Sequence, residues 1–313
     1  MKRNPCARAT RAAIGAVFAV ALTAQATTAE EETKPAVSDV NGKIAATGGV
    51  LQQEGVYYLD GSVSVPLSHS LGLQLDGLVG VLDGDGVAGT GAHAFWRDPD
   101  IGLLGAYGSI LASTAGSNYT IGNVGFEGAY YYEDFNFEGA VGVQFGQNIE
   151  TDAFASLNAA VYLWDDLRLY AGYRYWFEKH SAAGGFEWQL PGNDNSIAWS
   201  IFADGRASDE NDVTATAGVR VYFGEHKSLK RRHREDDPIS LLPTDLSIIV
   251  NQLATARMSL PPGCAVGDGE GGCRECLDGY FLVRGLYDRM TLRDGISGGM
   301  CVPETTLTAR PQG

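Results

Sequence analysis

The sequence predicts an all-β protein, an antiparallel transmembrane β-barrel of about 12 strands followed by a small disulfide-containing C-terminal tail. Between residues 43 and 223, stretches of roughly ten residues alternate apolar with polar or small side chains, and turn residues separate them. The chain also begins with the features of a secretory signal. After that signal, no run reaches the roughly twenty consecutive apolar residues that a membrane-spanning helix needs, so strands must carry any membrane role.

Residues 1–26 have the composition of a cleaved signal peptide. Four basic residues precede an apolar run over residues 12–24, and a small-residue Ala-Gln-Ala site closes the segment. The run is too short to span the hydrocarbon of a bilayer. Cys6 precedes the run and is expected to leave with the peptide. Residues 27–42 are then a periplasmic N-terminal segment.

The barrel is expected over residues 43–223. Its strands are predicted at residues 43–51, 56–67, 71–81, 88–97, 101–111, 119–131, 136–146, 152–164, 166–177, 182–190, 195–205 and 212–223. In the last strand Val219 and Val221 share one face, while Arg220 and Tyr222 share the other, as the two-residue period of a strand requires. A soluble β-sandwich or lipocalin-like barrel also alternates but points its apolar face inward, and this is the alternative interpretation.

Aromatic residues recur near the turns at one end of the predicted barrel. An even number of strands brings both ends of the barrel domain to that same side. Tryptophan and tyrosine favour the headgroup level of a membrane, and the interface candidates are Trp96, Tyr130, Tyr132, Trp164 and Trp188. Stacking within hairpins is the alternative for each of them. With this side toward the periplasm, the opposite loops, rich in Gly, Ser, Asn, Asp and Thr, face outside.

This arrangement resembles bacterial outer-membrane β-barrels of the porin-like superfamily. The residues that carry the resemblance are the alternating strands and the closing stretch from Gly218 to Phe223. The resemblance implies an outer-membrane location in contact with its lipids, and recognition of the aromatic Phe223 by the barrel-assembly machinery. A further 90 residues follow Phe223, which departs from the family pattern, in which the aromatic residue ends the chain.

Carrying the alternation through each strand places charged side chains in the lumen. The candidates for a constriction are Asp60, Asp76, Glu127, Glu138, Arg168, Arg174, Arg206 and Arg220. Acidic residues dominate the earlier strands and arginines the later ones, and such a separation of charge orients and filters small polar solutes in a pore. The alternative is an ion-pair network that closes a narrow barrel.

The predicted function is therefore passive diffusion of small hydrophilic solutes through a charged lumen. The alternative function is a non-conducting outer-membrane anchor or assembly protein, whose periplasmic tail binds a periplasmic protein or the cell wall. The whole chain carries a net charge of −15, and loss of the four basic signal residues leaves 19 basic against 38 acidic residues, a net charge of −19. Nucleic acid is not an expected partner of such an acidic chain.

Enzymatic activity is not predicted, and neither is a cofactor or a metal. The sequence contains no Gly-rich phosphate loop, HExxH pattern or nucleophile elbow. A catalytic alternative would pair His180 with Asp152, Asp209 or Asp212 near the outer ends of strands. His93, by contrast, is expected to be a lumen or packing residue.

After the barrel, residues 224–259 are expected to leave the barrel into the periplasm. A basic cluster between Lys227 and Arg234 either contacts lipid phosphates of the inner leaflet or forms a solvated linker. The stretch 239–259, which includes Leu242 and Leu246, is compatible with a short amphipathic helix. Its apolar face needs a cover, which the tail, the barrel mouth or a partner would supply.

Residues 260–313 contain four cysteines in the spacing C-x8-C-x2-C-x24-C, namely Cys264, Cys273, Cys276 and Cys301. In an exported chain these residues favour two disulfides, with the connectivity open. Zinc is the weaker alternative because its second ligand pair is split. A redox site is weaker as well, since such a motif belongs on a thioredoxin-like unit. The sequence thus predicts a disulfide-stabilised periplasmic tail.

Overall fold

A computed structural model describes most of the chain from residue 33 onward. The described residues are 33–51, 54–82, 84–114, 119–146, 149–176, 179–191, 197–208, 213–243, 246, 263–267, 273–283 and 300–303. The predicted signal peptide therefore lies outside the described residues, as does most of the predicted amphipathic helix. Within the described ranges, no helix has the length and hydropathy needed to cross a bilayer.

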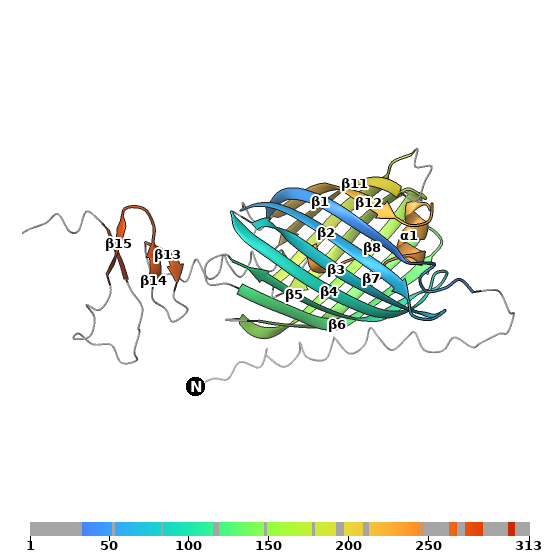
Figure 1. The fold of residues 1–313 in the computed structure, drawn as a ribbon, viewed down its shortest axis with the longest axis horizontal. Helices are drawn as coiled ribbons and strands as arrows, with labels where there is room; N and C mark the ends of the chain where they lie inside the picture. The colour runs from blue at the N-terminus through green and yellow to red at the C-terminus, as the bar shows by residue number, and fades with distance from the viewer. Residues whose placement is uncertain are drawn as a thin grey trace, which may run out of the picture. The chain divides into compact units, whose positions relative to one another are not determined.

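Twelve antiparallel strands form one closed barrel, which confirms the predicted fold class (Figure 1). The strands are β1 (Asn41–Leu51), β2 (Glu54–Pro66), β3 (Leu71–Leu82), β4 (Asp85–Asp98), β5 (Gly102–Ser113), β6 (Tyr119–Tyr132), β7 (Phe135–Gly146), β8 (Ile149–Trp164), β9 (Leu167–Trp176), β10 (Lys179–Gln189), β11 (Ile197–Ser208) and β12 (Val213–Phe223). Each strand pairs with its neighbour in sequence, and β1 pairs with β12 from Gly42↔Phe223 to Leu51↔Thr214. Closure therefore satisfies every strand edge, as a barrel in lipid requires.

The two faces of the barrel wall differ in chemistry. In β2, Val56, Tyr58 and Asp60 point inward and are buried, whereas Tyr57 and Leu59 between them are 70% and 53% exposed. Large apolar side chains are exposed on the outer face of strand after strand around the barrel. A soluble sandwich or lipocalin-like barrel would bury its apolar face inside. The exposed outer face instead suits contact with lipid, as in outer-membrane barrels.

We call the barrel end where β1 begins and β12 ends the turn end, and the opposite end the loop end. The five interface candidates all lie near the turn end of their strands and expose their rings on the outer face: Trp96, Tyr130, Tyr132, Trp164 and Trp188. Tyr131, between two of them, points inward and is buried. This placement is compatible with the membrane-interface role that the sequence predicts.

Beyond β12 the chain turns back on itself. Gly224 has a φ of +121°, a backbone conformation that residues with a Cβ rarely adopt, directly after the last barrel residue. The helix α1 (Leu229–Glu235) follows, and it buries Leu229, Arg232 and His233. The chain therefore does not run away from the barrel as the predicted linker would. We call residues 224–246 the inserted segment.

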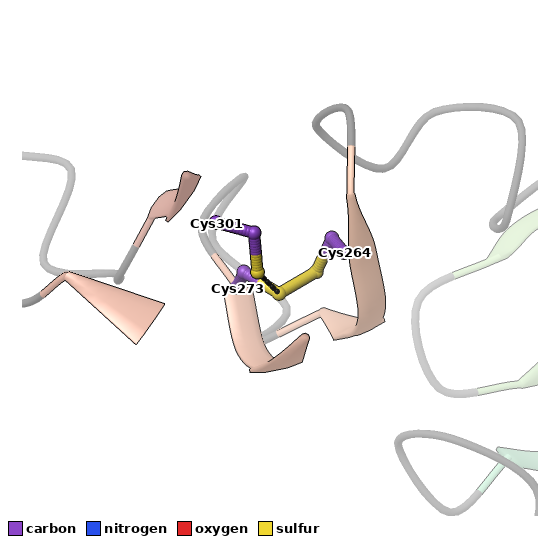
Figure 2. Close-up of side chains that lie close together, drawn as sticks. All are labelled: Cys264, Cys273 and Cys301. Carbon is purple, nitrogen blue, oxygen red and sulfur yellow. Dashed lines mark hydrogen bonds between the residues drawn. A yellow bond between two sulfur atoms is a disulfide. The ribbon is translucent and has the colours of Figure 1, made fainter. Parts of the chain in front are cut away.

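The cysteine-containing region forms two short hairpins, which we call the disulfide module. They pair β13 (Cys264–Gly267) with β14 (Cys273–Cys276) and β15 (Tyr280–Val283) with β16 (Met300–Pro303). Disulfides join Cys264 to Cys273 and Cys276 to Cys301. The Sγ atom of Cys301 lies 3.1 Å from that of Cys273, next to the first of these disulfides, as Figure 2 shows for Cys264, Cys273 and Cys301. Isolated two-stranded sheets of this size have marginal stability in water, so the disulfides stabilise the module in place of a large hydrophobic core.

Candidate functional site

The inserted segment is tied to the turn end of the barrel by α1. The Nζ atom of Lys230 lies 2.7 Å from a carboxylate oxygen of Asp134 in the β6–β7 turn. The backbone N–H of Leu229 donates to the Asp166 carboxylate, and Arg234 donates to the Asn136 side chain over 2.9 Å. The hydrogen bond from Lys230 also lowers the pKa of Asp134. The basic cluster thus binds the barrel's own turns, which differs from both the lipid contact and the solvated linker expected from sequence.

Three parts of the chain meet around Arg97 and Lys227 at the turn end. The Arg97 guanidinium, 1% exposed, donates to the carbonyl oxygens of Ala36 (2.6 Å) and Asp236 (2.7 Å). The Lys227 ammonium donates to the Asp236 carboxylate and to the Ser38 hydroxyl, each over 2.5 Å. The segment before β1, strand β4 and the inserted segment are therefore locked together by buried charge-assisted hydrogen bonds.

His233 is the buried centre of the contact between α1 and the barrel wall. Its Nδ1 lies 2.8 Å from the hydroxyl of Tyr162 in β8, and its Nε2 lies 3.2 Å from that of Tyr222 in β12. Burial holds the pKa of His233 well below its usual range, although Glu187 at 3.7 Å opposes this effect. His233 is therefore neutral at pH 7.

Several lumen charges predicted from sequence are paired. Arg168 in β9 lies 2.7 Å from the Glu138 carboxylate in β7, and Arg220 in β12 pairs with Glu187 in β10. Arg174 instead donates to the side-chain oxygen of Asn158 over 2.7 Å. That partner is neutral, so the charge of Arg174 is not balanced by it.

A second polar group lies on the opposite wall. His93 places Nε2 3.0 Å from Asp76 and Nδ1 2.8 Å from Glu127, and the ring is fully buried. Gln74 donates to Asp76 over 2.8 Å and accepts a hydrogen bond from Ser64. Asp76 and Glu127 are thereby fixed in a hydrogen-bonded network on β2, β3, β4 and β6.

Space remains between the inserted segment and one side of the wall. A cavity of about 160 Å³ lies between the segment and strands β8 to β12, β1 and β2. Its charged lining consists of Lys43, Asp60, Arg168, Arg174, Glu187, Asp204, Arg206 and Arg220. Five cations against three carboxylates make this lining net positive. A smaller cavity of about 60 Å³, between the segment and strands β5 to β8, includes Glu127 and Glu138 in its lining.

The loop end of the lumen is apolar. We call this ring of inward-facing residues the outer collar: Leu51, Val56, Leu82, Val87, Leu111, Ile121, Phe154 and Trp176. Leu242 and Leu246 of the inserted segment pack against it, and both are 0% exposed. The sequence left three possible covers for these leucines: the tail, the barrel mouth or a partner. Among the described residues, the inner wall of the barrel mouth covers them.

All eight lumen candidates lie on the inner face of the barrel, but they do not act as one set. Asp60, Arg168, Arg174, Arg206 and Arg220 line the larger cavity, Glu127 and Glu138 line the smaller one, and Asp76 is held in the His93 network. Sequence reasoning missed Lys43 and Asp204 on the wall. It also missed that the inserted segment supplies His233 to the lumen. Strand alternation could have identified Lys43 and Asp204 as inward-facing residues. The charged run that contains His233 has the composition of a solvated linker and gives no such signal.

The catalytic alternative and the zinc alternative find little support in the described residues. The Nδ1 atom of His180 lies 2.5 Å from the hydroxyl of Tyr173, and Asp209 and Asp212 lie outside the described residues. In the disulfide module, the sulfur atoms of Cys264, Cys273 and Cys301 lie within 4.8 Å of one another. Zinc binds thiolates, whereas these sulfurs are in disulfides, so the oxidised module does not offer a zinc site.

Comparison with known proteins finds no matching family model and no matching curated protein. Among solved structures, the chain is similar to the KdgM porin, with a TM-score of 0.43 and 10% identity, covering 59% of this chain and 99% of that one. It is similar to Omp33 of Acinetobacter baumannii, with a TM-score of 0.38 and 11% identity, covering 60% and 99%. The translocator domain of the autotransporter NalP from Neisseria meningitidis gives 0.40 and 13%, covering 59% and 88%. At these identities the similarity concerns the barrel fold alone.

Proposed function

We propose that this protein is an outer-membrane channel of the porin type that admits small hydrophilic solutes and is narrowed by its own inserted segment. The observation that carries the proposal is the polar cavity of about 160 Å³ that remains between the segment and the wall. A cavity of this size has room for several water molecules or one small solute. Its net positive lining favours anions, because a charged wall raises the local concentration of the opposite charge.

A second candidate function is a non-conducting anchor. It is favoured by the ion pairs of Arg168 with Glu138 and of Arg220 with Glu187, which neutralise part of the lumen charge. The two candidates differ in one measurable property, which is ion flow through the full chain. Purified protein in a planar bilayer should give small but stable conductance steps as a channel, and none as an anchor.

Arg174→Glu is expected to reduce the anion preference of these steps without preventing folding. The substitution removes a cation and adds an anion in the cavity lining, where Arg174 has only neutral partners among its hydrogen bonds from β8 and β9. At about 10 Å in water each unit charge contributes roughly 0.4 kcal/mol, and screening over about one Debye length reduces this to roughly 0.15 kcal/mol. The change of two charge units acts in opposite directions on anions and cations, so the anion-to-cation permeability ratio should fall by roughly threefold. The reversal potential in a salt gradient measures this ratio.

The matched control is Lys34→Glu, which makes the same charge change at an exposed residue before β1, outside the cavity lining. A conducting Arg174→Glu protein with unchanged ion selectivity would remove Arg174 from the filter. Absence of conductance from the folded full-length protein would favour the anchor.

Acidification from pH 7 to pH 5 is expected to increase the conductance. The pKa of His233 is lowered in the folded protein, so its stabilising contribution is complete above the unfolded value of about 6.5 and is lost as the pH falls below it. Protonation would place a cation among Lys43, Arg168 and Arg220, with Glu187 as the opposing charge. This repulsion weakens the contact between α1 and the barrel wall, and the loosened segment obstructs the lumen less.

His233→Gln is the control for this pH response, because it keeps a polar side chain that does not titrate. Burial raises the pKa of Asp236, and this group opposes the response of His233, so the comparison must be made between the two proteins at each pH. An identical pH response in wild-type protein and in His233→Gln would exclude His233 as its source.

A further inference from the structure

The inserted segment advances steadily from the turn end toward the loop end. Lys230 contacts Asp134 in a turn, and Asp237 pairs with Lys43, near the start of β1. A Cβ atom on Gly91, midway along β4, would lie 3.6 Å from the Cγ atom of Leu242. The segment therefore reaches the middle of the barrel by residue 242.

At Leu246 the inserted segment reaches the outer collar. Its members lie near the loop end of their strands, for example Leu51 as the last residue of β1 and Leu82 as the last of β3. Leu246 is completely buried in this cluster. The apolar ring is removed from water where it packs against Leu242 and Leu246 of the passing chain, and this burial stabilises the inserted path. The collar is thus matched in chemistry and in position to the inserted segment.

We propose that the barrel serves as the conduit for its own C-terminal region, so that the disulfide module is displayed at the loop end, on the outer face of the cell. This location is opposite to the periplasmic one that the sequence alone suggests. The module suits an exposed position, because two disulfides hold it together without a large core. The proposal depends on threading alone, and it holds whether or not the remaining cavity conducts.

Epitope insertion in the full chain tests the proposal. One tag is placed between Asp278 and Gly279, an exposed turn of the module. Matched tags are placed at the turn end, between Glu133 and Asp134, and at the loop end, between Gly84 and Asp85. Antibody binding is measured on intact cells and again after permeabilisation of the outer membrane. The antibody is expected to bind the module tag on intact cells, as it binds the loop-end tag. If the module tag is bound only after permeabilisation, as is expected for the turn-end tag, the proposal is overturned.

A cross-link tests threading independently of any tag. Gly91→Cys combined with Leu242→Cys should form a disulfide, because the two positions face each other in the lumen. Thr90→Cys with Leu242→Cys is the matched control, since Thr90 faces outward and is exposed. Mass spectrometry identifies the linked peptides. A cross-link specific to the first pair supports the inserted path, and its absence in folded protein overturns it.

Discussion

Replacing both Leu242 and Leu246 with aspartate is expected to increase the single-channel conductance strongly. Both side chains are completely buried in the outer collar, and burying an unpaired carboxylate there costs several kcal/mol. The segment should therefore leave the collar, while the barrel wall keeps its hydrogen-bonded ladder. A 12-strand barrel without its inserted segment has a much wider lumen, so single-channel steps should increase on the order of tenfold.

Leu277→Asp is the matched control, because Leu277 lies in the disulfide module and is 52% exposed. It introduces the same carboxylate without touching the collar and should leave the conductance unchanged. A chain that lacks residues 224–313 should give the same large steps as the double variant. If the folded double variant conducts like the wild-type protein, the collar leucines do not seal the lumen.

Val219→Arg is expected to prevent stable insertion of the barrel. Val219 lies on the outer face near the middle of β12 and points toward lipid, between the inward-facing Gly218 and Arg220. A cation near the bilayer midplane costs roughly 2–4 kcal/mol, which is a large part of the stability of a protein of this size. The folded fraction in lipid vesicles, seen as the species that migrates differently before heating on a gel, should fall sharply. Leu169→Arg, on the outer face of β9 but two residues from its turn end, should have a smaller effect in the same direction.

Leu67→Arg controls for the added charge, because Leu67 follows β2 at the turn end and is 60% exposed. An arginine there remains at the aqueous boundary and should be tolerated. If Val219→Arg folds and inserts as well as Leu67→Arg, the outward assignment of Val219 would be wrong.

The barrel could be predicted from sequence because lipid on one side and a polar lumen on the other force a strict period of two. The last strand illustrates this, since the alternation of Val219 with Arg220 identifies its lipid face and its lumen face. The ends of the strands can be predicted less accurately from sequence than their faces. The strand predicted at residues 152–164 begins at Ile149, because pairing with its neighbour β7 extends the ladder past the last clear alternation.

The inserted segment could not be predicted in the same way. Its charges, such as Lys227 and Asp237, follow one another along the chain without a period, which is also typical of a solvated linker. Their partners lie on the barrel wall almost 200 residues away in sequence, as in the pair of Asp237 with Lys43. Local pattern contains no information about such contacts, so the lumen charges could be located from sequence but the chain that covers them could not.

The position of the inserted segment has a consequence for how the barrel assembles. The seam of the barrel joins β1 to β12, the first and last strands, and its closure requires bringing distant parts of the chain together. The segment contacts both sides of this seam, through Lys43 on β1 and Tyr222 on β12. It can therefore act as an internal brace that lowers the entropic cost of joining the two strands. Ring closure and docking of the segment then favour each other, although the hydrogen-bonded strands can also close without it.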